Sequence, residues 1–256
     1  MLNYIGAECY KLCHKKAFFV GMTLLLSGES LVFLSMFNEN NQRLEWSCLF
    51  LVMMLPVGLL LAPIFAALTF DDQYRYGTMK NEVIFGIPRS RIYLGKLSAA
   101  IMVGTAAGAV AVGWYLLLSQ IICKSEAGEA DGLLQFALQT SINAFPLWIA
   151  ALSFTFLLLM LLHNASGAIA VSYLICIAGT PVALMGCDSD APLALRLFDT
   201  LFYAAPFRVL YANGADTAFH ISAGGSSELY CWALGLGWVV VTTVIGMAAF
   251  RKREIR

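Results

Sequence analysis

The sequence predicts an all-α protein that crosses a membrane several times. Hydrophobic residues make up 60% of its 256 positions and charged residues only 12%, whereas soluble domains carry about 25% charged residues. The apolar residues form long runs without the alternation at every second position that a membrane β-barrel would show. The formal net charge is zero, so the composition provides no general basic surface for nucleic acid.

Six apolar runs are long enough to cross a bilayer, whose hydrocarbon layer of about 30 Å needs roughly 20 residues of helix. The predicted spans are 17–37, 46–70, 97–123, 142–162, 166–187 and 229–250. Pro56 and Pro63 lie in the second span and are expected to bend it. This bend is either a static feature or part of a moving helix.

The basic residues predict that both ends of the chain are cytoplasmic. With the N-terminus inside, 12 of the 16 Lys and Arg residues fall in cytoplasmic segments, as the positive-inside rule requires. A seventh span at 193–207 is excluded because this stretch is short and carries Arg196 and Asp199. We expect it to form a re-entrant amphipathic element on the outer side, between spans five and six.

The first residues, 1–16, predict an interfacial helix before the first span, because Leu2, Ile5 and Leu12 alternate with polar residues. No cleavage site follows the first apolar run, so we interpret it as a permanent anchor in the membrane. With no internal repeat or linker, residues 1–256 are expected to form a single transmembrane domain.

The segment 71–96 joins the second and third predicted spans and holds the largest polar surface on the cytoplasmic side. Met79, Val83 and Ile87 recur at helical spacing, which predicts a short amphipathic helix below the membrane. Gly86 and Pro88 are expected to end it, and Ser90 to cap the next helix.

This segment resembles a motif of ABC type-2 transporter permeases, and in particular of the six-span bacterial group that includes lantibiotic and bacteriocin immunity permeases. The pattern is an acidic residue followed by G-T-x-K-N-E, a glycine, an arginine, a tyrosine and a lysine. The matching residues are Asp71, Gly77, Thr78, Lys80, Asn81, Glu82, Gly86, Arg89, Tyr93 and Lys96. The six-span layout extends the resemblance to the whole chain.

The resemblance implies a permease subunit of an ATP-driven exporter, with alternating access and with ATP-Mg bound by a separate cytoplasmic ABC ATPase. It implies a coupling helix that docks on this ATPase, a second contact at the turn between spans four and five, and an N-terminal elbow helix. It further implies a second permease subunit, identical or paralogous, and an amphipathic or peptide-like cargo. The docking residues would be Gly77, Thr78, Lys80, Asn81, Glu82, Gly86, Arg89, Arg91, Lys96, His163 and Asn164. The alternative for the segment is a solvated basic collar that only fixes topology.

Glu29 places a carboxyl group inside the first predicted span, where a charge costs roughly 2.5–3.5 kcal/mol on insertion scales. It is expected to face the interior of the bundle. It either contacts cargo or protons, or it is a packing group satisfied by Ser27, Ser30 or a neighbouring helix. The third span carries Gly104 and Gly108 in a G-x-x-x-G pattern, which predicts close helix packing within the chain rather than a dimer seam.

Enzyme and metal motifs are missing from the sequence. It contains no P-loop, no H-E-x-x-H and no G-x-S-x-G, so we expect neither a catalytic residue nor a cofactor in this chain. Cys9, Cys13 and His14 are too few for a closed metal site, and no disulfide pairing can be chosen from the sequence. Two rival functions remain. One is a membrane immunity or scaffold protein that binds its target without transport. The other is an intramembrane hydrolase using Glu29 or His163, against which the lack of a paired nucleophile and base argues.

Overall fold

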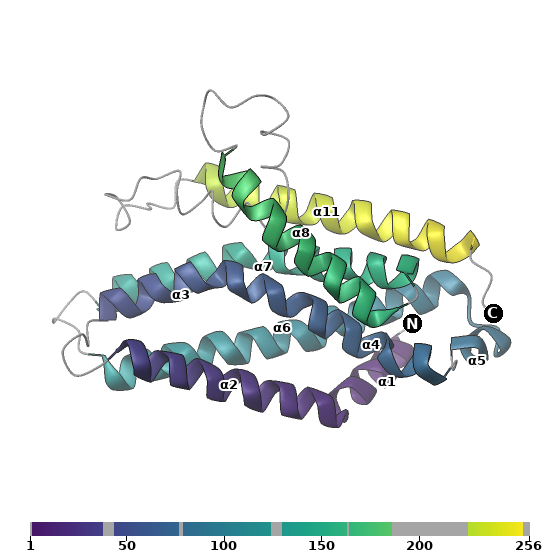
Figure 1. Ribbon diagram of the computed structural model, residues 1–256, viewed down its shortest axis with the longest axis horizontal. Helices are drawn as coiled ribbons and strands as arrows, with labels where there is room; N and C mark the ends of the chain where they lie inside the picture. Colours follow the sequence, from purple (N-terminus) through teal and green to yellow (C-terminus); the bar gives the residue numbers. More distant parts are fainter. Residues whose placement is uncertain are drawn as a thin grey trace.

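The computed structural model describes residues 2–37, 44–76, 79–123, 130–162, 164–185 and 225–252. These residues form a bundle of helices that run side by side along its long axis (Figure 1). The long elements are α2 (Lys16–Met36), α3 (Leu44–Gly58), α4 (Ala62–Tyr76), α6 (Arg89–Ile122), α7 (Ala130–Leu162), α8 (Ala165–Met185) and α11 (Gly225–Lys252). Two shorter helices, α1 (Leu2–Cys13) and α5 (Met79–Ile84), lie together at one end.

Four helices in this part of the chain are long and apolar enough to cross a membrane. They cover Lys16–Met36, Arg89–Ile122, Leu134–Leu162 and Cys231–Phe250. The other two predicted spans are also helical, as α3 with α4 and as α8. The all-α, multi-pass character is therefore confirmed, whereas the count of six spans stays a prediction.

The predicted bend in the second span is present as a short 3₁₀ segment, η1 (Leu59–Leu61), between α3 and α4. Pro63 has no N–H to donate to the carbonyl of Leu59, and the backbone N–H of Ala62 donates to that carbonyl instead. This shorter hydrogen bond is the tighter 3₁₀ pattern. The break between α3 and α4 thus follows from the covalent chemistry of proline.

Several helices are longer than their apolar runs. The helix α4 continues through Tyr76, α6 already begins at Arg89, and α7 begins at Ala130. Most of the expected polar connection 71–96 is therefore helical, and the turn between α5 and α6 is short. Ser90 lies inside the first turn of α6, whose N-cap is Pro88, so the expected capping role of Ser90 is wrong. The re-entrant element expected at 193–207 lies outside the described residues.

The core lies between α4, α6, α7 and α11, where Tyr93, Leu152 and Phe156 are fully buried. Two glycines bring helices into close contact: a Cβ on Gly235 would meet the backbone of Pro146, and one on Gly246 would meet the Tyr93 ring. Polar bonds add to this packing, since Thr242 Oγ1 donates to Ser153 Oγ at 2.9 Å. Small residues and hydroxyl pairs of this kind are what hold helices together in lipid.

The outer faces of α2 and α11 are apolar and exposed. On α2 they include Leu24 and Leu31, and on α11 Leu236 and Val240, each more than half exposed. A soluble protein would not show such continuous apolar surface to water. These faces fit a hydrocarbon solvent, in agreement with the predicted class.

Candidate functional sites at the basic end and inside the bundle

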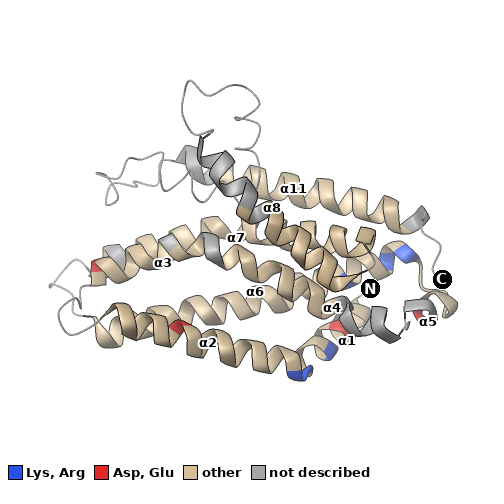
Figure 2. Ribbon diagram, in the orientation of Figure 1, with Lys and Arg blue, Asp and Glu red and all other residues tan. Residues whose placement is uncertain are grey.

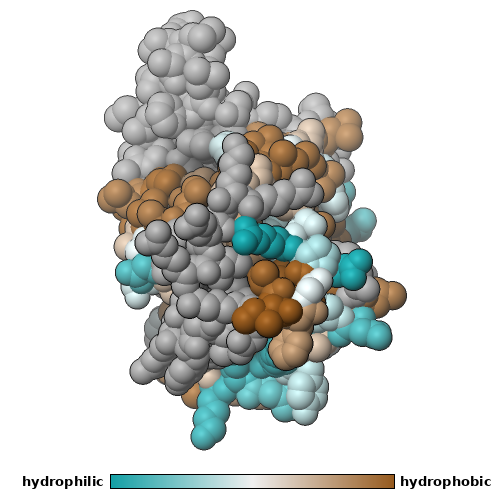
Figure 3. All heavy atoms as spheres, turned by 90° about the vertical axis from the view of Figure 1, so that its right-hand side faces the viewer, coloured by the Kyte–Doolittle hydropathy of each residue, from teal (hydrophilic) through white to brown (hydrophobic). Residues whose placement is uncertain are grey.

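The described basic side chains gather at one end of the bundle. Every Lys and Arg coloured in Figure 2 lies at the right-hand end, which also holds α1, α5, the start of α6 and the last turn of α11. Figure 3 looks onto this end and shows hydrophilic side chains around exposed hydrophobic ones. The described residues of the predicted docking motif fall in this region.

The turn between α5 and α6 depends on Gly86, which has a φ of 78°. The N–H of Gly86 donates to Val83 O at 3.0 Å, and that of Ile87 donates to Glu82 O at 3.3 Å. This pair of bonds is a Schellman motif, in which a glycine takes the left-handed conformation that ends the helix. The sequence prediction that Gly86 and Pro88 end the short helix is thereby confirmed.

Lys96 forms the centre of a buried ion cluster. Its side chain is 0% exposed, and its Nζ lies 3.0 Å from Glu82 Oε1 and 3.3 Å from Glu8 Oε2. Glu8 is itself 5% exposed and also pairs with Lys11 at 2.7 Å. An ammonium in such a place is tolerable only because two carboxylates compensate it. The cluster therefore connects α1, α5 and α6 through charge.

Tyr4 completes the cluster from α1. Its hydroxyl donates to Glu82 Oε2 at 2.9 Å, and Lys96 Nζ lies 5.6 Å from the centre of its ring. A Cβ on Gly95 would meet this ring, so the glycine makes room for it. Burial and, secondarily, the negative charge of Glu82 raise the pKa of the Tyr4 phenol above its ordinary value. The neutral, hydrogen-bonding form of Tyr4 is thus the favoured one.

The remaining predicted docking residues lie at the starts of α6 and α8, within α5, or outside the described residues. Arg89 is the first residue of α6, and Arg91 is exposed in the first turn of the same helix. Asn164 is exposed at the start of α8 and accepts a hydrogen bond at Oδ1 from the N–H of Ser166, at 3.1 Å. Lys80 and Asn81 lie in α5. Gly77, Thr78 and His163 lie outside the described residues.

Two sets of residues at this end were not singled out from the sequence. Glu8 and Tyr4 hold Lys96, and a signal existed for them: Tyr4, Glu8 and Leu12 share one helical face, and a carboxylate in a buried stripe requires a partner. Ile84 and Phe85, at the tip of α5, are 78% and 84% exposed. The predicted apolar face contained Val83 and Ile87, which do pack against the core.

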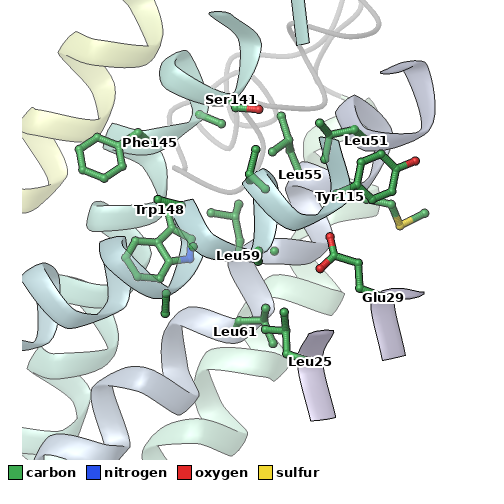
Figure 4. Close-up of a pocket in the computed structure, with 18 of the residues that line it drawn as sticks. Leu25, Glu29, Leu51, Leu55, Leu59, Leu61, Tyr115, Ser141, Phe145 and Trp148 are labelled. Atoms are coloured by element: carbon green, nitrogen blue, oxygen red, sulfur yellow. The ribbon is translucent and has the colours of Figure 1, made fainter. Parts of the chain in front are cut away.

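A second candidate site is a cavity of about 1130 Å³ inside the bundle. Its walls come mainly from α2, α3, α6 and α7, and they are almost entirely apolar. Among the described lining residues, Glu29 is the one charged side chain. In Figure 4 its carboxylate points from α2 toward the space bounded by Leu59, Leu55 and Tyr115.

Glu29 Oε2 is buried and has no hydrogen-bond partner among the described residues. The two expected partners are engaged elsewhere: Ser27 Oγ donates to Leu24 O at 3.2 Å, and Ser30 Oγ donates to Leu26 O at 2.7 Å. Ser30 also accepts a bond from Trp114 Nε1. The expectation that Glu29 faces the interior is met, whereas satisfaction by Ser27 or Ser30 is not.

The two glycines of the G-x-x-x-G pattern differ in their surroundings: one packs against a neighbouring helix and the other faces the cavity. Gly104 receives the ring of Trp148, but a Cβ on Gly108 would meet nothing, and Gly108 lines the cavity. Cys48 and Cys123 share one buried cluster with Phe33 and Tyr115. Within the described ranges no group of three potential ligands could hold a metal ion.

The chain matches the model of the ABC-2 family transporter proteins over residues 4–179. Because the match covers more than half of the sequence, the chain belongs to this family. It is thus a multi-pass membrane protein and the permease component of an ABC transporter, a kind of subunit that is not itself catalytic and that works with an ABC ATPase. No curated protein matches the chain.

Proposed function

We propose that this permease belongs to an exporter and that a separate cytoplasmic ATPase docks on the tip of α5 and the start of α6. The observation that carries the proposal is the contrast within α5. Its carboxylate Glu82 is turned inward to Lys96, whereas Ile84 and Phe85 are 78% and 84% exposed at the basic end. Large apolar side chains exposed beside basic residues are suited to anchor an interface.

The surroundings of this tip have the polar groups that an interface rim needs. Arg91 is exposed on the first turn of α6, and Asn164 is exposed at the start of α8, which lies at the same end (Figure 1). Lys80, Asn81 and Arg89 would contribute further polar contacts, and the proposal also includes Gly77, Thr78 and His163 as docking residues. In this proposal Gly86, Glu82 and Lys96 act indirectly, because they set the position of the tip.

The ion cluster would transmit a movement of α5 to the membrane-spanning helix α6. A displaced α5 cannot move alone, because Glu82 is bonded both to Lys96 in α6 and to Tyr4 in α1. Movements caused by ATP binding at the partner would therefore reach α6 directly and lead to alternating access. The transport path would require a second permease subunit, identical or paralogous, in the surrounding lipid.

The direction of transport and an amphipathic or peptide-like cargo rest on the resemblance to immunity permeases. Six spans with both termini in the cytoplasm complete the proposal, supported by the shared location of α1 and the end of α11 at the basic end (Figure 2). Reporter fusions at both termini test this arrangement. An external C-terminus would overturn the six-span topology.

The docking proposal is tested by co-purification of the co-expressed ATPase with variants of this chain. Phe85→Asp should reduce the recovered ATPase by at least about tenfold, since loss of an anchor costs 2 kcal/mol or more. Leu2→Asp is the matched control, because Leu2 is 83% exposed at the same end of the bundle. Arg91→Glu should also weaken recovery, and Lys16→Glu should leave it unchanged.

Full recovery of the ATPase with both Phe85→Asp and Arg91→Glu would contradict the docking site. If wild-type protein recruits no ATPase yet still protects cells against a toxic peptide, the alternative of an immunity or scaffold protein without transport would replace the proposal. A reversal at Glu82 is unsuitable here, because it would leave Lys96 beside a second cation and disturb the fold itself.

A further inference from the structure

We infer that the cavity between α2, α3, α6 and α7 is a binding site for an amphiphile with one apolar chain and one primary ammonium group. Glu29 would receive the ammonium, and the apolar walls would receive the chain. The inference concerns binding and stands apart from the docking of an ATPase. That such an amphiphile is also the exported cargo rests on the proposed function.

The first support is the size and chemistry of the cavity. Its volume of about 1130 Å³ is slightly above the usual range of ligand pockets, about 300–1,000 Å³. Leucine, glycine and aromatic residues provide most of the lining. Figure 4 shows Leu59, Leu61 and Trp148 around the same space into which Glu29 points.

The second support is that three hydroxyl groups on the wall are already engaged. Thr105 Oγ1 donates to Met102 O, and Ser141 Oγ donates to Ala137 O. Tyr115 donates its hydroxyl hydrogen to Ser47 O at 3.1 Å. Glu29 Oε2, by contrast, is buried without a partner among the described residues. Among the described lining residues the cavity thus offers one charged group, the Glu29 carboxylate, and this group is an acceptor.

Membrane chemistry then selects the class of ligand. Lipid tails surround the protein, so an apolar chain gains little by leaving lipid for an equally apolar cavity. The head group must provide the preference, and a carboxylate in low dielectric strongly favours a cation that also donates hydrogen bonds. An anionic head would be repelled by Glu29, and so would the phosphate of a zwitterion. A single ammonium on an apolar chain is cationic, donates hydrogen bonds and carries no anionic group, so it fits the cavity.

The test uses purified full-length protein in phosphatidylcholine nanodiscs and needs no ATPase. The probe is a dodecyl chain carrying a photoreactive diazirine and a terminal primary ammonium. The matched neutral probe ends in a hydroxyl group instead. After illumination, mass spectrometry measures the extent of labelling and locates the labelled peptides.

We expect the ammonium probe to label peptides of α2, α3 and α6 at least about tenfold more than the hydroxyl probe, as a charge-assisted hydrogen bond predicts. Glu29→Gln should lower ammonium labelling to the level of the hydroxyl probe. Glu45→Gln, the same change at a carboxylate outside the cavity lining, should have no effect. Glu29→Asp should retain the preference for the ammonium.

A steric variant tests the location independently of charge. A Cβ on Gly108 meets no atom within 4 Å, and Gly108 lines the cavity, so Gly108→Leu should fill part of it and reduce labelling by both probes. Equal labelling of wild-type protein by the two probes, or ammonium labelling that both Glu29→Gln and Gly108→Leu leave intact, would overturn the inference. Because the ATPase is absent, these results do not depend on whether the docking proposal holds.

Discussion

Lys96 and Glu29 are both ionisable groups on long helices, but Lys96 is fully buried, Glu29 is only partly buried, and their surroundings are opposite. Lys96 at the basic end has two carboxylates within 3.3 Å and an aromatic ring beside it. Glu29 has an oxygen that no described residue bonds to, and a cavity lies in front of it. The first arrangement is complete within the chain and holds three helices together. The second is incomplete, which is typical of a group that serves a ligand or a movement.

The largest expected effect comes from removing the centre of the complete cluster. Lys96→Met would leave Glu8 and Glu82 facing each other in a buried site, and breaking such a set costs about 3–5 kcal/mol. We expect a lower midpoint of unfolding in detergent and loss of monodisperse protein.

The control for this variant removes all three charges at once, as Glu8→Gln, Lys96→Met and Glu82→Gln. Replacing a complete buried set by neutral groups is often close to neutral, so most of the stability should return. If Lys96→Met is as stable as wild-type protein, the cluster does not hold the helices together.

Tyr4→Phe should have the next largest effect, because it removes a hydrogen bond to a charged group, worth about 1.5–3 kcal/mol, and keeps the ring against Gly95. The pKa of Tyr4 is raised by burial, so its contribution is complete below the ordinary pKa of about 10 and is lost as the pH rises above that value. Unfolding curves at about pH 8 and about pH 11 should therefore show a smaller difference between variant and wild-type at the higher pH. A difference that grows with pH would contradict this assignment.

Glu29→Leu should act in the opposite direction to Lys96→Met. Because no described residue bonds to Glu29 Oε2, an apolar side chain should stabilise the protein by about 1–3 kcal/mol, the cost of burying an unsatisfied polar group. Thermal unfolding of the purified variant measures this. Destabilisation of the variant would show that Glu29 has a structural partner, and would weaken the contrast with Lys96.

The smallest expected effect concerns the turn at Gly86, which sets the orientation of α5 relative to α6. Gly86→Ala places a Cβ in the left-handed region and should cost about 1–2 kcal/mol. Gly6→Ala is the matched control, since Gly6 lies inside α1 with open space around it and the change should stabilise by about 0.5–1 kcal/mol. Equal effects of the two substitutions on the unfolding midpoint would show that the turn carries no conformational demand.

The apolar runs predicted the helical class and the position of each long helix, because hydropathy reports directly on contact with lipid. The polar extensions were missed for the same reason. Residues 71–76 and 89–96 carry charges, so they have no hydropathy signal. In the second stretch the helix is supported by the burial of Ile92, Tyr93 and Lys96, which hydropathy does not report. The bend at η1 was predictable, since proline removes a backbone donor wherever it occurs.

The candidate sites were predictable to different degrees. Glu29 stands out in any apolar run, but only the three-dimensional arrangement shows that Ser27 and Ser30 bond to their own helix. The motif correctly marked the basic end, yet gave Glu82 and Lys96 no partners, because those partners include Glu8 and Tyr4 far away in the sequence. The exposure of Phe85 was not predicted, because an apolar residue next to a helix end gives no sign in the sequence of whether it is exposed.

The ion cluster also has a consequence for the order of biosynthesis. Glu8 and Tyr4 leave the ribosome early, whereas Lys96 follows Glu8 by 88 positions. At about 5–20 residues per second, this delay is about 4 to 18 s. Throughout that interval Glu8 can pair only with Lys11 of its own helix, and the link from α1 to α6 cannot form. The N-terminal helix can therefore be fixed in place only after the first two apolar segments have been synthesised, so this early part of the chain is among the later parts to reach its final position.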